Sequence, residues 1–211
     1  MNNLFKTTLS LAAFAGLAAC GGGSTSTNPY QTLQNRTDAY LEQIDRVSAL
    51  YPSGPATMNN ASGTATYSGT GSIVVNPTFI GETLLYADAT LLGDADLYVN
   101  FGANRPTLNR PTLNGSITDL FGIDSNDNVD EYTGTVQVRN GYIGDDTHNS
   151  VTASYAGTIR GNGDTISLNG NMYGTVLGNP SPRVIDLIGF GDSTIGSYQG
   201  TSIVGVTVER D

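Results

Sequence analysis

The chain has 211 residues, with nine basic and 19 acidic side chains, and its formal net charge at pH 7 is −10. Such an acidic chain repels phosphate backbones and anionic headgroups, which argues against binding to nucleic acid. Tryptophan is absent and 27 residues are glycine. Together with abundant Ser, Thr, Asn and Asp, this composition is typical of an exported all-β domain with many turns, and it is unlike that of a helical enzyme.

The N-terminal segment predicts export and a lipid anchor. After Lys6, an apolar run from Leu9 to Leu17 ends in Leu17-Ala18-Ala19-Cys20. The run is too short to span a membrane, which takes about 20 apolar residues. The segment resembles the lipobox of bacterial lipoprotein signal peptides, so we expect residues 1–19 to be removed and Cys20 to be acylated, for example with palmitate. An ordinary secretory signal cleaved after the alanines is the alternative.

Acylation at Cys20 predicts where the protein is located. Cys20 is the only cysteine, and its acylation consumes a thiol that is otherwise reactive in an exported protein. Gly21 stands where an aspartate favours retention in the inner membrane of such lipoproteins. We therefore expect a lipid anchor in the outer membrane of a Gram-negative bacterium, at the cell surface or on the periplasmic face. The remaining chain keeps eight arginines against 19 acidic residues, a net charge of −11.

The segment after the anchor predicts a tether and then a helix. Residues 20–29 combine the lipidated cysteine with a Gly/Ser/Thr-rich tether, a composition typical of flexible linkers. Residues 30–52 predict an amphipathic helix, because apolar side chains recur at spacings of three and four residues. They are Leu33, Tyr40, Leu41, Ile44, Val47 and Tyr51. The helix either packs on the following domain or offers a face to a partner.

From about residue 60 to residue 211 the apolar pattern has a period of two, which predicts antiparallel strands wetted on one side. Turn residues separate the strands at Asn76-Pro77, Asn140-Gly141, 161–164 and Asn179-Pro180. The expected fold is all-β, an antiparallel up-and-down β-barrel of about eight strands preceded by the helix. A two-sheet sandwich is the alternative. The strand candidates are 63–69, 84–92, 94–101, 113–119, 132–142, 151–160, 165–176, 184–190 and 201–209.

Short motifs in this region resemble a known family. The run Ile166-Ser167-Leu168-Asn169-Gly170-Asn171-Met172-Tyr173-Gly174 is similar to late strands of the barrel lobes of transferrin-binding protein B and related surface lipoproteins, including factor H-binding protein. Further similar pieces are 65–69, 92–97, 196–198 and 203–208. The resemblance covers residues 62–209, one barrel lobe, and it departs from the family pattern at 175–177. It implies a single transferrin-binding protein-like barrel with a binding role at the outer membrane.

One loop resembles the start of a calcium-binding loop. Asp124, Asn126 and Asn128 have the spacing of the first three ligands of such loops. However, Val129 stands in place of the required glycine, and Thr135 stands in place of the bidentate glutamate. A polar hairpin loop is the favoured interpretation, and we expect no metal ion or other cofactor.

Three further residues are candidates for ligand binding. Arg105 and Arg110 begin two tandem copies of Arg-Pro-Thr-Leu-Asn, which suggests an exposed recognition loop or a duplication that lengthened a hairpin. His148 is the only histidine, and it is a candidate haem ligand or a solvated loop residue. No nucleophile, base and acid are grouped as a catalytic triad needs, so we do not expect an enzyme. The expected function is binding of a protein partner or nutrient carrier, such as one for iron or haem. The alternatives are a small-ligand (haem) carrier and a structural envelope lipoprotein.

Overall fold

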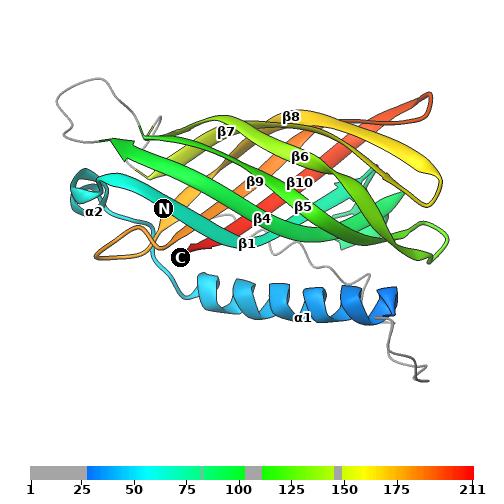
Figure 1. Ribbon diagram of the computed structural model, residues 1–211, viewed down its shortest axis with the longest axis horizontal. Coiled ribbons are helices and arrows are strands. Elements are labelled where there is room, and N and C mark those ends of the chain that lie inside the picture. Colours follow the sequence, from blue (N-terminus) through cyan, green and yellow to red (C-terminus); the bar gives the residue numbers. More distant parts are fainter. Residues whose placement is uncertain (1–27, 82, 103–110, 145–148) are drawn as a thin grey trace.

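The protein folds into a closed barrel with a helix along its outside (Figure 1). This computed structural model describes residues 28–211 except 82, 103–110 and 145–148. Two helices come first, α1 (Pro29–Ser48) and α2 (Pro55–Asn60). The strands follow as β1 (Gly63–Val75), β2 (Thr78–Ile80), β3 (Thr83–Tyr86), β4 (Ala89–Gly102), β5 (Thr112–Asp124), β6 (Val129–Ile143), β7 (Ser150–Gly161), β8 (Asp164–Leu177), β9 (Val184–Ile195) and β10 (Tyr198–Arg210).

Eight antiparallel strands close the barrel, in the order β1-β10-β9-β8-β7-β6-β5-β4. β1 pairs with β4 along one side and with β10 along the other, so the ring has no free edge. β2 and β3 leave the ring between β1 and β4 and form a separate two-stranded sheet. The predicted all-β, eight-stranded up-and-down barrel preceded by a helix is therefore confirmed, and the sandwich alternative is wrong.

The barrel interior is filled by apolar side chains. Along β4, the inward residues Ala95, Leu97, Val99 and Phe101 are at most 1% exposed. The residues between them, Asp94 to Asn100 at every second position, face outward and are exposed. An eight-stranded barrel is just wide enough for side chains to fill. The apolar face that the period of two predicts is thus the core, and the outer wall is mostly polar.

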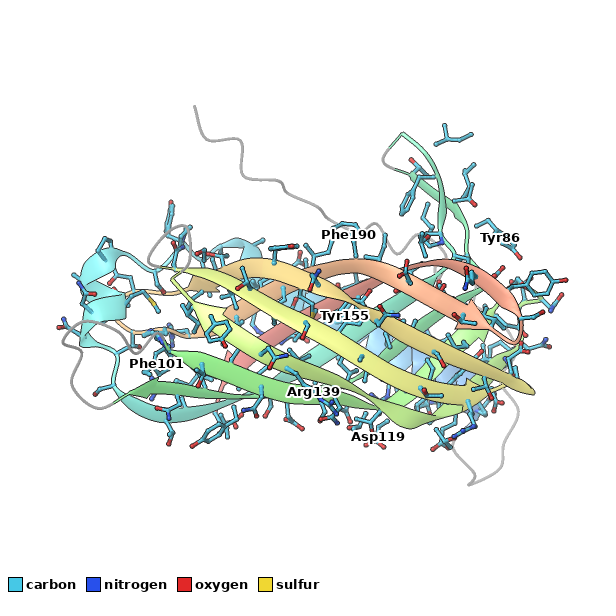
Figure 2. All side chains as sticks on the ribbon, turned by 90° about the horizontal axis from the view of Figure 1, so that it is seen from above. Tyr86, Phe101, Asp119, Arg139, Tyr155 and Phe190 are labelled. Atoms are coloured by element: carbon cyan, nitrogen blue, oxygen red, sulfur yellow. The ribbon has the colours of Figure 1, made fainter. Side chains whose placement is uncertain are left out.

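Tyr155 occupies the middle of the barrel, and glycines make room for it (Figure 2). Its hydroxyl lies 2.8 Å from the Ser202 hydroxyl, which satisfies both groups in the core. A Cβ at Gly170, Gly189 or Gly191 would come within 2.8 Å of the Tyr155 side chain. These three positions therefore accept only glycine without a shift of the ring or the backbone.

The helix α1 packs against the outer wall of the barrel. Asn28 caps its first turn, Pro29 occupies its first position, and Leu33 and Tyr40 pack against Leu92 of β4. Of the predicted apolar stripe, Leu33, Tyr40 and Val47 are buried, whereas Leu41 and Tyr51 are exposed. The helix thus ends earlier than predicted and packs on the barrel. Among the helices in the described ranges, none has the length and apolar character needed to cross a bilayer.

Ion pairs and one cation–π contact also hold α1 on the barrel. The Arg36 guanidinium lies 2.7 Å from an Asp94 carboxylate oxygen and 5.3 Å from the centre of the Phe121 ring. Near the other end of the helix, Arg46 binds Glu209 at 2.8 Å. Solvent screens exposed ion pairs of this kind, so the apolar contacts provide most of the attachment.

Two local predictions are wrong. Asn140-Gly141 is not a turn between strands. It lies inside β6, where the register against β7 shifts between Arg139 and Tyr142, and Asn140 has a φ of 52°. A bulge uses the same left-handed residue that a hairpin turn uses, so the dipeptide does not distinguish them. The prediction of one strand at 84–92 is also wrong. Residues 87–88 are not in a strand, and they separate β3 from β4.

Asp186 is a carboxyl on the outer wall whose ionisation affects the stability of the folded protein. It lies on β9 close to the Tyr40 side chain and accepts a hydrogen bond of 2.8 Å from the Thr207 hydroxyl. Burial raises the pKa of the Asp186 carboxyl, and the Thr207 hydrogen bond opposes that rise. A carboxyl whose pKa is raised in the folded state takes up its proton there first, so the folded protein gains stability as the pH falls through that pKa.

We expect Asp186→Asn to unfold at a higher temperature than the wild type at pH 7, because it keeps an acceptor for Thr207 and removes a buried charge. The difference should shrink as the pH falls and the wild-type carboxyl becomes neutral. Thermal unfolding at pH 7 and pH 4 measures both effects. Asp96→Asn, on the exposed face of β4, is the control and should change stability by less than about 0.5 kcal/mol. A difference in unfolding temperature between Asp186→Asn and the wild type that is the same at pH 7 and pH 4 would contradict a raised pKa of Asp186.

Candidate functional site

The barrel has two ends with different chemistry. At the pocket end lie the β5–β6, β7–β8 and β9–β10 turns, together with the passage from β1 through β2 and β3 to β4. At the opposite end, here the loop end, lie α2 and the β4–β5, β6–β7 and β8–β9 connections (Figure 1). Candidate binding residues occur at both ends, because connections carry most of the variable side chains of a barrel.

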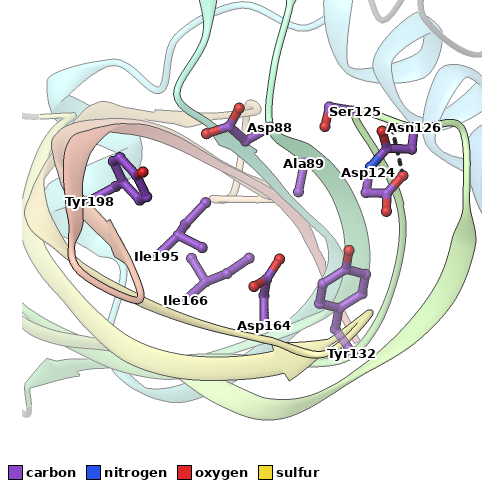
Figure 3. Close-up of a pocket in the computed structure, with 10 residues that line it drawn as sticks. All are labelled: Asp88, Ala89, Asp124, Ser125, Asn126, Tyr132, Asp164, Ile166, Ile195 and Tyr198. Carbon is purple, nitrogen blue, oxygen red and sulfur yellow. Dashed lines mark hydrogen bonds between the residues drawn. The ribbon is translucent and has the colours of Figure 1, made fainter.

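A cavity of about 210 Å³ opens at the pocket end (Figure 3). Its lining comes from six strands and their connections, and it combines three carboxylates, two tyrosines and two isoleucines with smaller groups. The lining residues are Asp88, Ala89, Asp124, Ser125, Asn126, Tyr132, Asp164, Ile166, Ile195 and Tyr198. This volume is below the roughly 300 Å³ at which pockets for drug-sized ligands begin. The cavity therefore suits a small group.

Asp124 organises one wall of the cavity by closing the β5–β6 turn. Its carboxylate accepts hydrogen bonds from the backbone N–H groups of Asn126, at 2.8 Å, and Asn128, at 2.9 Å. The Asn128 side-chain amide adds another at 3.0 Å. Burial acts to raise the pKa of Asp124, but the hydrogen bonds from Asn128 and Asn126 hold it below its ordinary value.

The structure thus brings Asp124, Asn126 and Asn128 together as a hairpin turn. Asn128 directs its amide nitrogen, and not its oxygen, toward Asp124, and most of the acceptor capacity of that carboxylate is used within the turn. In the described part of the chain, no three His, Cys, Asp or Glu side chains are grouped so that they could hold a metal ion. The expectation that this loop binds no metal ion, with calcium as the less favoured alternative, stays a prediction.

Tyr132 forms the floor of the cavity beside the β7–β8 turn. Burial raises its pKa to about 12, so the phenol is neutral at physiological pH. The Asn162 side chain donates to the Tyr132 hydroxyl at 3.1 Å, and the Asn162 backbone N–H donates to Asp130 at 3.2 Å. Asn162 has a φ of 51° and Gly163 a φ of 81°, which is the geometry of a tight hairpin turn. The predicted turn at 161–164 is confirmed.

Asn76 fixes the opposite wall, where the chain leaves β1 for the β2–β3 hairpin. Its side-chain oxygen accepts hydrogen bonds from the Ser193 hydroxyl at 2.8 Å and from the Thr201 backbone N–H at 2.9 Å. Its amide nitrogen donates to Asp88 in the cavity wall. A Cβ at Gly200 would collide with the Asn76 side chain. One side chain therefore joins β1, β9, β10 and Asp88.

The cavity can bind a small polar or cationic group through its carboxylates and tyrosines. Among its lining residues, no histidine or lysine stands beside a nucleophile to take up a proton. Sequence reasoning missed Asp88, Tyr132, Asp164 and Tyr198. Each lies within a few residues of a turn or strand end, but a period of two does not reveal which turns meet around one opening.

The other predicted site residues lie outside the described residues: Cys20, Arg105, Arg110 and His148. The strand ends that flank three of them are described. Gly102 and Thr112 border the segment with both arginines, while Ile143 and Ser150 border the segment with His148. All four strand ends lie at the loop end, so the chain returns to the same end of the barrel for both segments.

Comparison with known proteins gives no relative: no family model, no curated protein and no solved structure matches the chain. The resemblance to the transferrin-binding protein B-like barrels therefore stays a prediction.

We expect Asn76→Ala to destabilise the protein by about 2 kcal/mol, because the change removes the side-chain acceptor of the Thr201 N–H and one of the two acceptors of the buried Ser193 hydroxyl, which keeps its bond to the Thr201 carbonyl. Urea unfolding measures the loss. Asn171→Ala, at an exposed position of β8, is the matched control and should cost less than about 0.5 kcal/mol. Equal stability of the two variants would contradict the role of Asn76.

Proposed function

We propose that the protein is a lipid-anchored outer-membrane lipoprotein, without catalytic activity, whose barrel binds a protein partner or nutrient carrier through the segments at its loop end. The observation that carries the proposal is that the chain enters the fold at one end of the barrel, while the segments with candidate binding residues leave from the other end. The chain enters the fold at the pocket end, where the Tyr30 hydroxyl donates to the Asp127 carbonyl at 3.1 Å. The segments with Arg105, Arg110 and His148 leave from the opposite end. An anchor at Cys20 then keeps the loop end free for a partner.

The packed interior and the polar outer wall support the same proposal. Tyr67, Phe101 and Tyr155 are among the largest fully buried side chains, and they fill the space that a carrier barrel keeps for its ligand. A haem carried inside the barrel therefore has no support among the described residues. The outward side chains of β4 include Asp94, Asp96 and Asn100, whereas a lipid-facing wall is apolar. Both features favour a protein ligand bound by surface segments.

The anchor is tested by the mass of the protein purified from membranes. We expect the wild type to begin at an acylated Cys20 and Cys20→Ser to lack the acyl mass and appear in the soluble fraction. Several acyl chains give a durable tether, at about 0.8 kcal/mol per buried methylene. Ser24→Ala, in the same segment, is the control and should be acylated normally. Retention of an unmodified thiol at Cys20 in the membrane-purified protein would refute lipidation.

The binding role is tested by affinity capture with an immobilised chain that starts at residue 20 and carries Cys20→Ser. We expect it to retain a protein from the surrounding medium, and the Arg105→Ala/Arg110→Ala variant to bind that protein at least about tenfold more weakly, or 1.4 kcal/mol. Arg139→Ala/Arg160→Ala removes the same charge from exposed positions on the barrel strands and is the matched control. Equal losses in the two double variants would show that net charge, and not the loop end, governs binding.

A further inference from the structure

The β2–β3 hairpin exposes apolar side chains away from the barrel. Figure 2 shows it standing clear of the barrel wall, with Tyr86 at its base. Ile80 is 70% exposed, Leu85 56%, Tyr86 50% and Phe79 39%. A two-stranded hairpin on its own is only marginally stable in water, and a cluster of exposed apolar side chains marks an interaction site. The hairpin therefore concentrates four exposed apolar side chains within eight residues, whereas the exposed Tyr98, Tyr142, Tyr173 and Phe190 are distributed over several barrel strands.

Both faces of the hairpin are apolar. Successive side chains of a strand point to opposite faces, so Phe79, which pairs with Leu84, and Ile80 lie on different faces, while Leu85 lies at the bulge between the two strands. A hairpin that docks on a protein surface needs one apolar face and keeps the other polar. Apolar side chains on both faces suit immersion in an apolar medium, which is the property of a lipid surface.

The base of the hairpin is held firmly to the pocket end. The Asn76 N–H donates to the Thr201 carbonyl at 2.8 Å, and the Asp88 N–H donates to the Val75 carbonyl at 2.9 Å. The Tyr86 hydroxyl donates to the Asp88 carboxylate at 3.0 Å. These bonds fix the direction in which the hairpin leaves the barrel.

The hairpin lies at the end of the barrel where the chain enters the fold. The Ser125 N–H donates to the Asp88 carbonyl at the hairpin base, and Asp127 in the same turn binds Tyr30 in the first turn of α1. Only eight residues separate Cys20 from Pro29. At no more than about 3.6 Å per residue, an anchor at Cys20 is less than about 35 Å from the start of α1.

We infer that the β2–β3 hairpin inserts into the surface of the membrane that holds the anchor and forms a second membrane contact. The inference rests on the proposed lipidation of Cys20. The sequence from Thr78 to Tyr86 contains one charged residue, Glu82, so the hairpin suits a neutral lipid surface, and the acidic remainder of the chain disfavours an anionic one. The acyl chains hold the protein in the membrane but leave the barrel free to turn on its tether, and a second contact orients the barrel with its loop end outward.

The chain supplies clean reporters for a test, since it has no tryptophan and one cysteine. A chain starting at Cys20 retains every described element and can be coupled through that thiol to a maleimide lipid in phosphatidylcholine vesicles with brominated acyl chains. We expect the emission of Leu85→Trp to shift to the blue and to be mostly quenched. Tyr173→Trp, on the outer wall of β8, is the matched control, because both residues are 56% exposed, and it should remain unquenched.

Unquenched Leu85→Trp on fully coupled vesicles would overturn the inference. An emission shift of that reporter on adding a protein retained in the affinity capture would instead make the hairpin a protein-docking element. Chemical coupling makes the result independent of acylation in cells, so failure of the proposed lipidation appears only in the mass of the purified protein. Ile80→Ser/Leu85→Ser provides a second readout: it should lower binding of the uncoupled chain to the same vesicles and leave the Tm of the barrel unchanged, because the hairpin lies outside the core.

Discussion

Closure of the barrel through β1 is the constraint on which the rest of the structure depends. β1 carries two ladders, one with β4 along its whole length and one with β10 from Tyr67 to Val75, and without either of them two long strand edges would be left open. Closure also divides the connections between two ends, because consecutive antiparallel strands turn back alternately at one end and then at the other. The pocket and the hairpin share one end for this reason, and α1 begins at the same end because it runs back along the outer wall before β1.

The outer wall is not uniform, and α1 covers the part of it that departs from a simple polar surface. Beneath the helix lie Leu92, Ser72 and Thr207, all nearly inaccessible to solvent. Tyr40 and Gln43 of the helix are buried as well, so this contact mixes apolar packing with hydrogen-bonded polar groups. Burying polar groups is costly unless they have partners, and in the described part of the chain no buried side-chain N or O atom lacks one.

Much of the fold could be predicted from the sequence because burial alternates along the strands whose outer face meets solvent. The inward faces at 95–101, 151–159 and 166–176 follow directly from a period of two. The local errors arise where one residue type serves two geometries. Asn140 has the positive φ of a turn but forms a bulge, and the apolar run at 84–92 joins an exposed hairpin strand to a buried barrel strand. The cavity could not be predicted, because Asp88, Tyr132 and Tyr198 meet only once barrel register is known.

The Tyr155 side chain in the middle of the core separates the two ends of the barrel. Its ring, enclosed by Gly170, Gly189 and Gly191, closes the barrel axis at mid-height, with further apolar side chains above and below. The molecule is therefore a solid rod and not a tube. Nothing that enters the mouth at Tyr132 can travel to the opposite mouth, and any influence of one end on the other must pass along the hydrogen-bonded wall. The two ends can then change in sequence independently, each for its own contact, while the rod between them sets only their distance.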